Sequence, residues 1–327
     1  MPRSFFASIG LMAGLAVTFT PPAAAQDAAA GESVRLLVGF PVGSNTDQTA
    51  RVLAEGLRSR LGRPVEITNR PGGSGNVAAE AVARAAPDGT TLGLLSTSVA
   101  IAPHLARGLP FDPRTDFTPI SLFATAPFVV LVSPSQSARD LRQLAEALRA
   151  RPDTRCATPG AGTVTHLTTV LLTRALDAGA ACEAVHYSDP GQALADLRAG
   201  MIQLYVNAVP TSLPATRDGR ARAIAITSRQ RLAAAPEIPT ATEAGAPGFQ
   251  ADAWFGLVGP RGLSEVVASR LERAAVEAAR DPEVAARLRA LGAEPVGSSA
   301  AELAAMLQTE YTKWGEAARA AGLAAVR

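Results

Sequence analysis

Hydrophobic and polar positions alternate in blocks along this chain, and the blocks predict strands and helices in turn. Short apolar runs that are rich in β-branched residues and bounded by Gly, Pro or Asn are typical of buried strands. Longer runs with apolar side chains on one face indicate helices, as in residues 48–61, where Val52 and Leu57 share a face and Gly62 ends the pattern. The alternation therefore predicts an α/β fold.

The strand and helix patterns fall into two series. The predicted strands are residues 33–39, 65–68, 92–95, 128–132, 155–158, 183–187, 202–206, 223–227 and 254–258. The predicted helices are residues 48–61, 76–86, 165–176, 190–199, 264–280, 282–291 and 300–321, and one that carries Leu141, Leu144 and Leu148. Because strands and helices alternate in each series, the sequence predicts two lobes, each a mainly parallel sheet flanked by helices.

We expect the chain to cross between the lobes near residues 124–128 and again near residues 251–255. Residues 32–126 and 254–327 then form the first lobe, and residues 127–253 form the second. Open α/β sheets bind ligands beyond the carboxyl ends of their strands, and two such lobes form a cleft that closes by a hinge. No internal sequence repeat stands out.

Residues 1–25 have the layout of a secretory signal. Arg3 precedes an uncharged apolar run over residues 5–19, two prolines end that run, and Ala23-Ala24-Ala25 offers a cleavage site of small residues. The alternative is a membrane anchor, for which the run is short, since a span needs about 20 residues. We therefore expect export to the periplasm and cleavage near Ala25.

Composition and cysteine usage narrow the function classes. The chain of 327 residues has a formal net charge of +2, 5% aromatic residues and scattered arginines, which does not indicate a nucleic-acid-binding protein. Cys156 and Cys182 each begin an apolar run, and in an oxidising compartment they can form a disulfide; the alternative is two buried, unpaired thiols. Their spacing is not that of a metal site, so no metal or cofactor is expected.

Candidate binding chemistry lies in two Gly-rich turns, each between a predicted strand and a helix. The first is Phe40-Pro41-Val42-Gly43-Ser44-Asn45-Thr46-Asp47, and the second is Thr158-Pro159-Gly160-Ala161-Gly162-Thr163. The exposed amides and the dipole of a helix N-terminus favour a carboxylate or phosphate. Each turn alone can equally be an ordinary helix cap, but one turn in each lobe can grip an anion from both sides of a cleft.

Known catalytic constellations are missing from the sequence. His104, His166 and His186 lie far apart and lack the spacing of metal ligands, and residues 72–76 lack the last glycine of a nucleophile elbow. Gly73-x-Gly75-x-x-Ala78 matches a dinucleotide fingerprint, but it follows the second strand and no ribose-binding acid stands at the next strand end. A nucleotide-dependent enzyme is therefore the weaker hypothesis, and no catalytic residue is assigned.

Several segments resemble the Bug-type substrate-binding proteins of tripartite tricarboxylate transport systems, over nearly all of the mature chain. The matching segments are the first turn with Arg51, Asn69-Arg70-Pro71-Gly72-Gly73-Ser74-Gly75-Asn76, Ala86-Pro87-Asp88-Gly89, Gly160-x-Gly162-Thr163 with His166, Pro239-Thr240-Ala241-Thr242-Glu243-Ala244-Gly245, and Trp254-Phe255-Gly256-Leu257. The resemblance implies a Venus-flytrap fold of the periplasmic binding protein type II kind, no catalysis and a membrane transporter as partner. It also implies that a ligand carboxylate rests on backbone amides of the strand-to-helix loops.

Two departures from the family pattern bear on the ligand. Ser44 stands where a second glycine is usual in the first loop, and Tyr187-Ser188-Asp189 stands in place of Tyr-Lys-Gly. Because a lysine is lost and Asp189 is gained near the cleft, we expect a mono- or dicarboxylate, or a ligand with a polar or cationic group, rather than a tricarboxylate.

The ligand-binding residues that we expect lie at or just after strand ends. They are Phe40, Val42, Gly43, Ser44, Asn45, Thr46, Asp47, Thr97, Ser98, Gly160, Ala161, Gly162, Thr163, His166, Tyr187, Asp189 and Asn207. The leading hypothesis is a monomeric solute-binding protein that captures a small organic acid, aromatic and amino acids included, by hinge closure and delivers it to a membrane transporter. An exported sensor subunit of a membrane signalling protein is the alternative, since both use the same closure.

Overall fold

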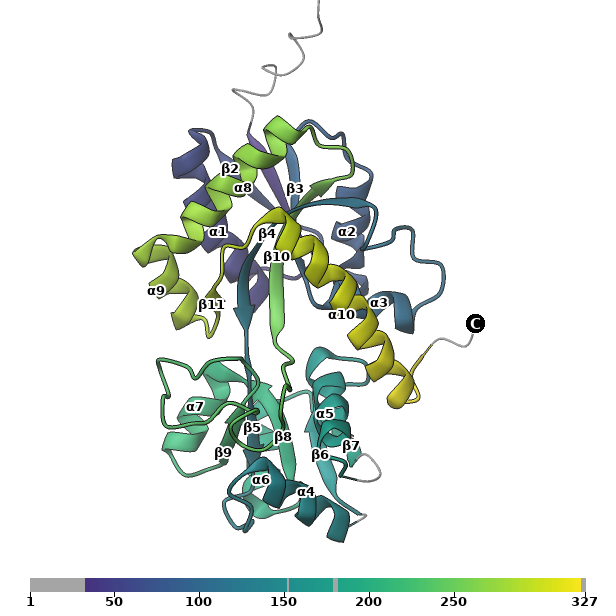
Figure 1. Cartoon of the computed structure of the whole chain (residues 1–327), viewed down its shortest axis with the longest axis vertical. Coiled ribbons are helices and arrows are strands. Elements are labelled where there is room, and N and C mark those ends of the chain that lie inside the picture. The colour runs from purple at the N-terminus through teal and green to yellow at the C-terminus, as the bar shows by residue number, and fades with distance from the viewer. Residues whose placement is uncertain (1–32, 152, 179–181, 325–327) are drawn as a thin grey trace, which may run out of the picture.

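The computed structural model describes residues 33–324 apart from 152 and 179–181, and these residues build two lobes, one above the other in Figure 1. From edge to edge, the sheet of the first lobe contains β11 (Glu294–Pro295), β4 (Phe117–Ala126), β10 (Ala253–Pro260), β3 (Thr91–Ser96), β1 (Val34–Val38) and β2 (Val65–Asn69). The sheet of the second lobe contains β7 (Glu183–His186), β6 (Arg155–Thr158), β8 (Leu204–Ala208), β5 (Phe128–Val132) and β9 (Arg222–Ile226). The expected signal segment lies outside the described residues.

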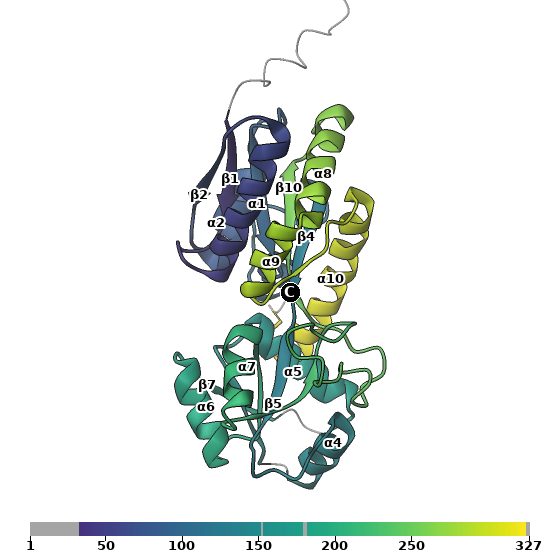
Figure 2. The same ribbon diagram turned by 90° about the vertical axis from the view of Figure 1, so that its left-hand side faces the viewer.

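Helices cover both faces of each sheet, as the two views show (Figures 1 and 2). The helices of the first lobe are α1 (Asn45–Leu61), α2 (Asn76–Ala83), α3 (Ser98–Leu105), α8 (Glu265–Arg280), α9 (Pro282–Ala290) and α10 (Ala300–Ala320), with a short 3-10 turn, η1 (Gly73–Gly75). Those of the second are α4 (Leu141–Ala150), α5 (Val164–Ala175), α6 (Pro190–Ala199) and α7 (Val209–Arg217). This is the two-lobe α/β architecture that the sequence predicts. None of the described helices is long and apolar enough to cross a membrane.

Strand direction explains how the two sheets are connected. In the first sheet β1, β2 and β3 are parallel, and β10 runs antiparallel to its neighbours β3 and β4. In the second, β6, β7 and β8 are parallel, and β5 runs antiparallel to β8 and β9. The reversed strands, β5 and β10, are those by which the chain enters each sheet from the other lobe, so they run away from the junction. Apart from the two-residue β11, all the remaining strands run toward the junction, so each sheet is mainly parallel.

Alternation along the strands places a hydrophobic core on each face of each sheet. Consecutive side chains of a strand point to opposite faces, and Leu36 and Leu37 of β1 accordingly belong to separate cores. Val130 and Leu131 of β5 divide in the same way between the two cores of the second lobe. Each lobe is therefore a three-layer unit, and the loops at the strand ends are held in place from both sides.

The two crossings between the lobes are tied together by one threonine. The hydroxyl of Thr227, just after β9, accepts a hydrogen bond from the amide of Phe128 (2.9 Å) and donates to Asp252 Oδ1 (2.7 Å). Phe128 begins β5 and Asp252 precedes β10, so a single buried hydroxyl joins both connecting segments. Burial raises the pKa of Asp252.

A buried glutamate attaches the second crossing to the last helix. Glu310 Oε2 on α10 accepts hydrogen bonds from the indole N–H groups of Trp254 (2.9 Å) and Trp314 (2.7 Å). The other carboxylate oxygen of Glu310 forms an ion pair with Lys313. Trp254 lies on β10 directly after the crossing, so α10 braces the strand at the junction.

Two glycines also lie at contacts between the lobes. A Cβ at Gly162, at the start of α5, would lie 2.5 Å from Leu105 Cδ1 at the end of α3. A Cβ at Gly292, after α9, would lie 2.7 Å from Pro210 Cδ on α7. Both contacts join one lobe to the other, and both glycines have positive φ, so side chains there would clash as well as strain the backbone.

Candidate functional site

The carboxyl ends of the parallel strands meet at the junction between the lobes. Ser96, the last residue of β3, pairs with Phe255 near the start of β10. In the second sheet Ala208, the last residue of β8, pairs with Phe128, the first residue of β5. The loops that follow β1, β3, β6, β7 and β8 therefore begin on the side of each lobe that faces the other lobe.

The turn after β1, residues 41–47, which we name the first-lobe turn, closes on itself through hydrogen bonds. Ser44 caps helix α1: its amide donates to Pro41 O (3.1 Å) and its hydroxyl accepts from the amide of Asp47 (3.2 Å). Asp47, in the first helical turn, reaches back and accepts a hydrogen bond from the amide of Gly43 (2.9 Å). Gly43 has φ of 85°, a conformation that glycine adopts without strain.

Asp47 is the centre of this turn and is wholly buried. Its carboxylate also accepts hydrogen bonds from Arg51 Nε (2.9 Å), Arg51 Nη2 (3.1 Å) and Asn69 Nδ2 (2.9 Å). Burial works to raise the pKa of Asp47, but the hydrogen bonds from Arg51, Gly43 and Asn69 outweigh it, so the pKa lies below its ordinary value. We expected Asp47 to contact a ligand; instead its carboxylate is enclosed by the protein and holds the turn.

The turn after β6, residues 160–166, which we name the second-lobe turn, has the same plan. Thr163 caps helix α5: its amide donates to Gly160 O (3.3 Å) and its hydroxyl accepts from the amide of His166 (3.4 Å). His166 reaches back as Asp47 does, and its Nδ1 accepts a hydrogen bond from the amide of Gly162 (3.1 Å). Gly162 has φ of 74°.

His166 is also buried, with 8% of its surface exposed, and so differs from an open pocket-lining residue. Burial lowers its pKa, and the neighbouring His186 lowers it further. The two imidazole rings are perpendicular, with centroids 6.0 Å apart, and His186 Nδ1 lies 2.7 Å from the hydroxyl of Thr158. The expectation that His166 contacts a ligand is thus replaced by a role in holding its own turn.

The two turns form a short internal repeat that the linear sequence did not make evident. The pattern Gly-Ser/Thr-x-Thr-x-x-Thr occurs as Gly43 to Thr49 and as Gly162 to Thr168. In both copies the side chain three residues after the capping residue accepts a hydrogen bond from the amide of the glycine. The amides of Gly43 and Gly162, which we expected to face an anion, are therefore already occupied.

The next amides in each turn are the ones left for a ligand. Among the described residues, the backbone N–H groups of Asn45 and Thr46 in the first-lobe turn and of Val164 and Thr165 in the second form no hydrogen bond. The hydroxyl of Thr165 is buried and has no partner within the same part of the chain. Unpaired amides in the first turn of a helix are the donors that bind carboxylates and phosphates.

Thr97 and Asn207 were expected to line the site, and both are instead engaged in the framework. Thr97, 1% exposed, accepts a hydrogen bond from the amide of Trp254 (2.9 Å) and so joins β3 to β10. Asn207, 7% exposed, donates through Nδ2 to the hydroxyl of Thr211 (3.0 Å) in the first turn of α7. These partners lie far along the sequence or on the next element, so strand-end position alone did not reveal them.

The remaining expected residues lie near the turns with different degrees of exposure. Val42 is 71% exposed at the tip of the first-lobe turn, and Phe40 packs against Gly75 in η1. Ser98 begins α3. Tyr187 donates to Asp196 Oδ2 (2.8 Å); burial and this carboxylate raise the pKa of Tyr187 to about 12.

Asp189 remains exposed at the start of α6. Its side chain accepts a hydrogen bond from the amide of Gly191 (2.8 Å) and caps the helix. Its charge therefore stands on the junction side of the second lobe, since α6 follows the carboxyl end of β7. Ser188 beside it brings no positive charge.

Cys156 and Cys182 are joined in a disulfide. Cys156 pairs in the sheet with Ala184, two residues after Cys182, so the bond links the starts of β6 and β7. It lies at the end of these strands remote from the junction. The disulfide therefore supports the second-lobe turn only through the strands that carry it.

A family model described as the tripartite tricarboxylate transporter family receptor matches residues 49–323. The chain belongs to this family. A family of receptors for transporters implies a binding protein and not an enzyme. Gly73 and Gly75, which match a dinucleotide fingerprint in the sequence, form only the short turn η1.

Known relatives cover nearly the whole receptor. Protein BugT of Bordetella pertussis (strain Tohama I) is 32% identical over 319 residues, which is 97% of each chain. The structure of R. palustris Rpa4515 with adipate is 30% identical, has a TM-score of 0.72 and covers 90% of this chain and 98% of that one. MatC from Rhodopseudomonas palustris with bound malate is 34% identical, has a TM-score of 0.66 and covers 87% and 98%.

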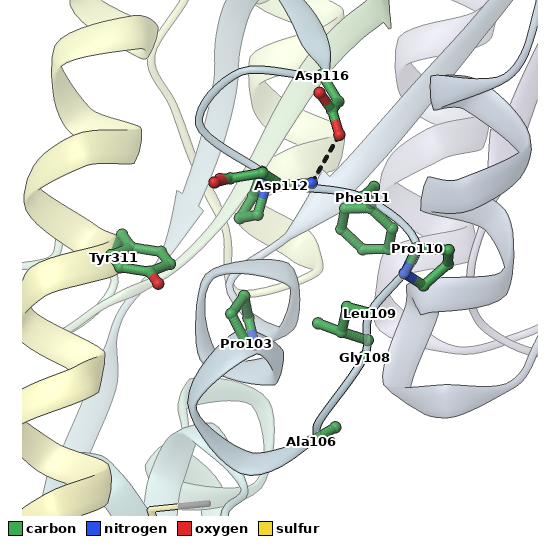
Figure 3. Close-up of a pocket in the computed structure, with 10 residues that line it drawn as sticks. Pro103, Ala106, Gly108, Leu109, Pro110, Phe111, Asp112, Asp116 and Tyr311 are labelled. Carbon is green, nitrogen blue, oxygen red and sulfur yellow. Dashed lines mark hydrogen bonds between the residues drawn. The ribbon is translucent and has the colours of Figure 1, made fainter. Parts of the chain in front are cut away.

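Two surface hollows of the receptor lie apart from the turns. One, of about 470 Å³, is bounded by residues 106–116, Pro103 and Tyr311 of α10 (Figure 3). The other, of about 410 Å³, lies over residues 240–250 beside Arg229. The first belongs to one lobe and is lined by Asp112, which forms an ion pair with Arg114 (2.7 Å), and by Asp116. No cluster of three or more potential metal ligands occurs among the described residues.

Three residues that organise or complete the receptor's turns were given no role in the site by the sequence, although Arg51 and Asn69 lie in segments that resemble the family. Arg51 is placed one helical turn after Asp47, a spacing that signals an ion pair. Asn69 ends β2, the strand next to β1, and donates to Phe40 O (3.0 Å) as well as to Asp47. Thr165 became a candidate only when its unpaired hydroxyl was located.

Proposed function

We propose that the receptor captures a small mono- or dicarboxylate between its two turns, closes around it by a hinge motion and delivers it to a membrane transporter. The observation that carries this proposal is the repeated turn. Each lobe presents a capped helix N-terminus on its junction side, with two first-turn amides that have no partner among the described residues. Such amides, aided by the helix dipole, favour a carboxylate without a charged side chain.

The surroundings of the second-lobe turn favour a ligand of low charge. Asp189 brings a negative charge to the junction side and Ser188 brings none, so each further carboxylate on a ligand meets repulsion. Adipate and malate, found in two relatives, carry two carboxylates each. A monocarboxylate, a dicarboxylate or an amino acid, whose amino group suits Asp189, fits this charge pattern better than a tricarboxylate.

The hinge follows from the two crossings. We assign residues 32–126 and 254–327 to the first lobe and residues 127–253 to the second, with Thr227 and Asp252 at the pivot. Closure would bring the two turns onto opposite sides of one ligand. Residues 1–25 would direct export to the periplasm, where the receptor would act as a monomer.

A thermal-shift screen of the mature chain, beginning at Gln26, tests the ligand class. The panel is malate, adipate, benzoate and glutamate, with citrate as the tricarboxylate. A bound acid at 100 times its dissociation constant stabilises the folded state by about 2.7 kcal/mol, which raises the melting temperature measurably. If none of the acids raised it, or if citrate alone did, the proposed ligand class would be wrong.

A matched pair of variants tests the location. Thr165→Val removes the unpaired hydroxyl in the first turn of α5, and we expect about a fivefold to tenfold weaker affinity, the worth of roughly one hydrogen bond. Thr168→Val removes the next such hydroxyl, which is also without a partner in the described chain but lies deeper in the helix and is fully buried. Titration calorimetry should show the loss in the first variant only; equal losses would point to packing, and no loss in either would move the site elsewhere.

A further inference from the structure

The hydrogen bond from Gly162 to His166 fixes the protonation state of the ring. A backbone N–H can only donate, so Nδ1 of His166, 3.1 Å away, presents a lone pair. The ring is therefore neutral, with its proton on Nε2. A protonated ring carries hydrogen on both nitrogens, so a proton on Nδ1 would face the hydrogen of the Gly162 amide.

The first-lobe turn shows what this position requires. Asp47 occupies the place of His166 and accepts from the amide of Gly43 at 2.9 Å. Two chemically different side chains in corresponding places therefore have the same role, because each accepts a hydrogen bond from the amide of the glycine that precedes the capping residue. An aspartate keeps that capacity throughout the neutral range, whereas a histidine keeps it only while unprotonated.

We propose that His166 is a positioning residue for the carboxylate site, which holds the second-lobe turn in its binding conformation only while neutral, so that acidification releases the ligand. The inference rests on the proposed function, because it concerns the same turn. Loss of the bond to Gly162 frees the segment before the cap, and the amides of Val164 and Thr165 then lose their fixed direction. The preorganised donors that bind the carboxylate are lost with it.

The surroundings of His166 agree with a switch between neutral and charged forms. His186 on β7 is the titratable group that faces it, 6.0 Å between ring centroids, and Thr158 at the end of β6 contributes only a hydroxyl, bound to His186. Helix α10 and strand β8 also pack against α5. Burial, and to a smaller extent His186, lower the pKa of His166 below its ordinary value, which favours the neutral form near neutrality.

The turn is also in contact with the other lobe. Gly162 lies against Leu105 at the end of α3, where a single added carbon would clash. A displaced turn therefore alters a contact between the lobes as well as the anion site. Simple charge attraction has the opposite sign: a histidinium beside a bound carboxylate would strengthen binding on acidification.

The experiment measures ligand affinity against pH in the full mature chain, with the acid of the screening panel that gives the largest thermal shift. From about pH 7.5 down to about pH 4.5, a range that extends well below the ordinary histidine value of 6.5, the dissociation constant of the wild type should be flat at first. It should rise toward tenfold per pH unit once the pH is below the lowered pKa of His166, as one proton competes with binding. His166→Asn keeps a neutral acceptor for Gly162 and should retain affinity at pH 7.5. On acidification it should lose only the affinity that protonation of the acid itself costs, so its profile is the reference for the wild type. His166→Ala should bind more weakly than the wild type at pH 7.5, and His186→Gln should keep the fall.

A second readout needs no ligand. The amide proton of Gly162, followed by NMR, should shift as His166 titrates, and it should not shift over this range in His166→Asn. An affinity that rises or stays flat on acidification in the wild type, or a fall as steep in His166→Asn as in the wild type, would overturn the inference while leaving the carboxylate site intact. Failure of every acid to bind the wild type at pH 7.5, by contrast, removes the proposed function itself.

Discussion

The first-lobe turn and the second-lobe turn have one backbone plan and two kinds of anchor. In both, a serine or threonine caps a helix and a side chain in the first helical turn accepts the amide of the preceding glycine. In the first lobe that side chain is an ionised aspartate with three partners; in the second it is a neutral histidine with one. The backbone plan therefore sets the geometry of the donors, and the anchor sets how firmly and over what pH range they are held.

The anchors also connect the turns to different neighbours. Asp47 is bonded to Asn69 at the end of β2, so the first-lobe turn is tied to the adjacent strand of its own sheet. The second-lobe turn has Leu105 of the other lobe against it, and its strand β6 is linked to β7 by the disulfide. The first turn is thus a fixed part of its lobe, whereas the second is supported at a distance and from across the junction.

Removing the disulfide should give the largest stability change, and it tests the remote support of the second-lobe turn. For a cross-link between residues 26 apart, the chain-entropy relation predicts a loss of about 3.5 kcal/mol for Cys156→Ser with Cys182→Ser. Urea unfolding measures it, and thiol titration of the denatured, non-reduced wild type should find no free thiol. Two free thiols in that titration would show that the disulfide does not form and would contradict this part of the comparison.

Asp47→Ala should have the next largest effect, because it strips the first-lobe turn of its anchor. The Gly43 amide and the Asn69 side chain lose their acceptor, which costs about 2–3 kcal/mol, and the half-exposed Arg51 loses its ion pair with Asp47. His166→Ala removes one accepted bond and should cost less, about 1 kcal/mol. If urea unfolding gave the larger loss for His166→Ala, the distinction between the two anchors would fail.

The two anchors should also separate along the pH axis. Both groups have a lowered pKa in the folded protein, so the unfolded chain binds protons more readily and stability falls as pH falls. For His166 the loss begins below 6.5 and continues to its lowered pKa; for Asp47 it begins below 3.8. Stability measured against pH should show these as separate declines. His166→Asn should reduce the upper one, to which His104 also contributes because burial lowers its pKa too, and should leave the lower one unchanged. A single decline unaffected by that variant would contradict the assignment.

Most of the fold follows from the sequence because its strands are short, apolar and bounded by turns. The predicted strands and helices lie within a few residues of those in the structure, and β5, β6 and α6 match at both ends. The ten-residue β4 was missed because Pro119 and its polar positions interrupt the apolar pattern, although β10 and β11 pair with it. Helices α3 and α7 were missed because prolines lie inside them, and tertiary contacts such as His104 with Tyr311 O (2.8 Å) stabilise what propensity does not.

The candidate site was predictable in place but not in detail. Glycines and a capping hydroxyl before a helix locate both turns from sequence. Which amides remain for a ligand depends on where the side chains of Asp47 and His166 point, and strand and helix patterns carry no such information. Thr97 bonds to Trp254, a residue 157 positions away, so its role emerges only when β3 and β10 are paired.

The capping hydroxyls should give the smallest effects and the closest comparison of the turns. Ser44→Ala and Thr163→Ala each remove a cap, which costs about 1 kcal/mol. Thr163→Ala should cost slightly more, because its hydroxyl also donates to Gly160 O (2.7 Å). Both should weaken ligand binding, since each cap orients the neighbouring amides.

Ser264→Ala is the matched control for the caps. Ser264 caps α8 with a similar bond to Val267 (3.3 Å) but follows the end of β10 that is remote from the junction. Its replacement should lower stability in urea by a similar amount and leave affinity in calorimetry unchanged. If all three variants lost affinity alike, the cost would be general loosening of the fold. Loss in the two turn variants alone would show that the site depends on the backbone plan that both lobes share.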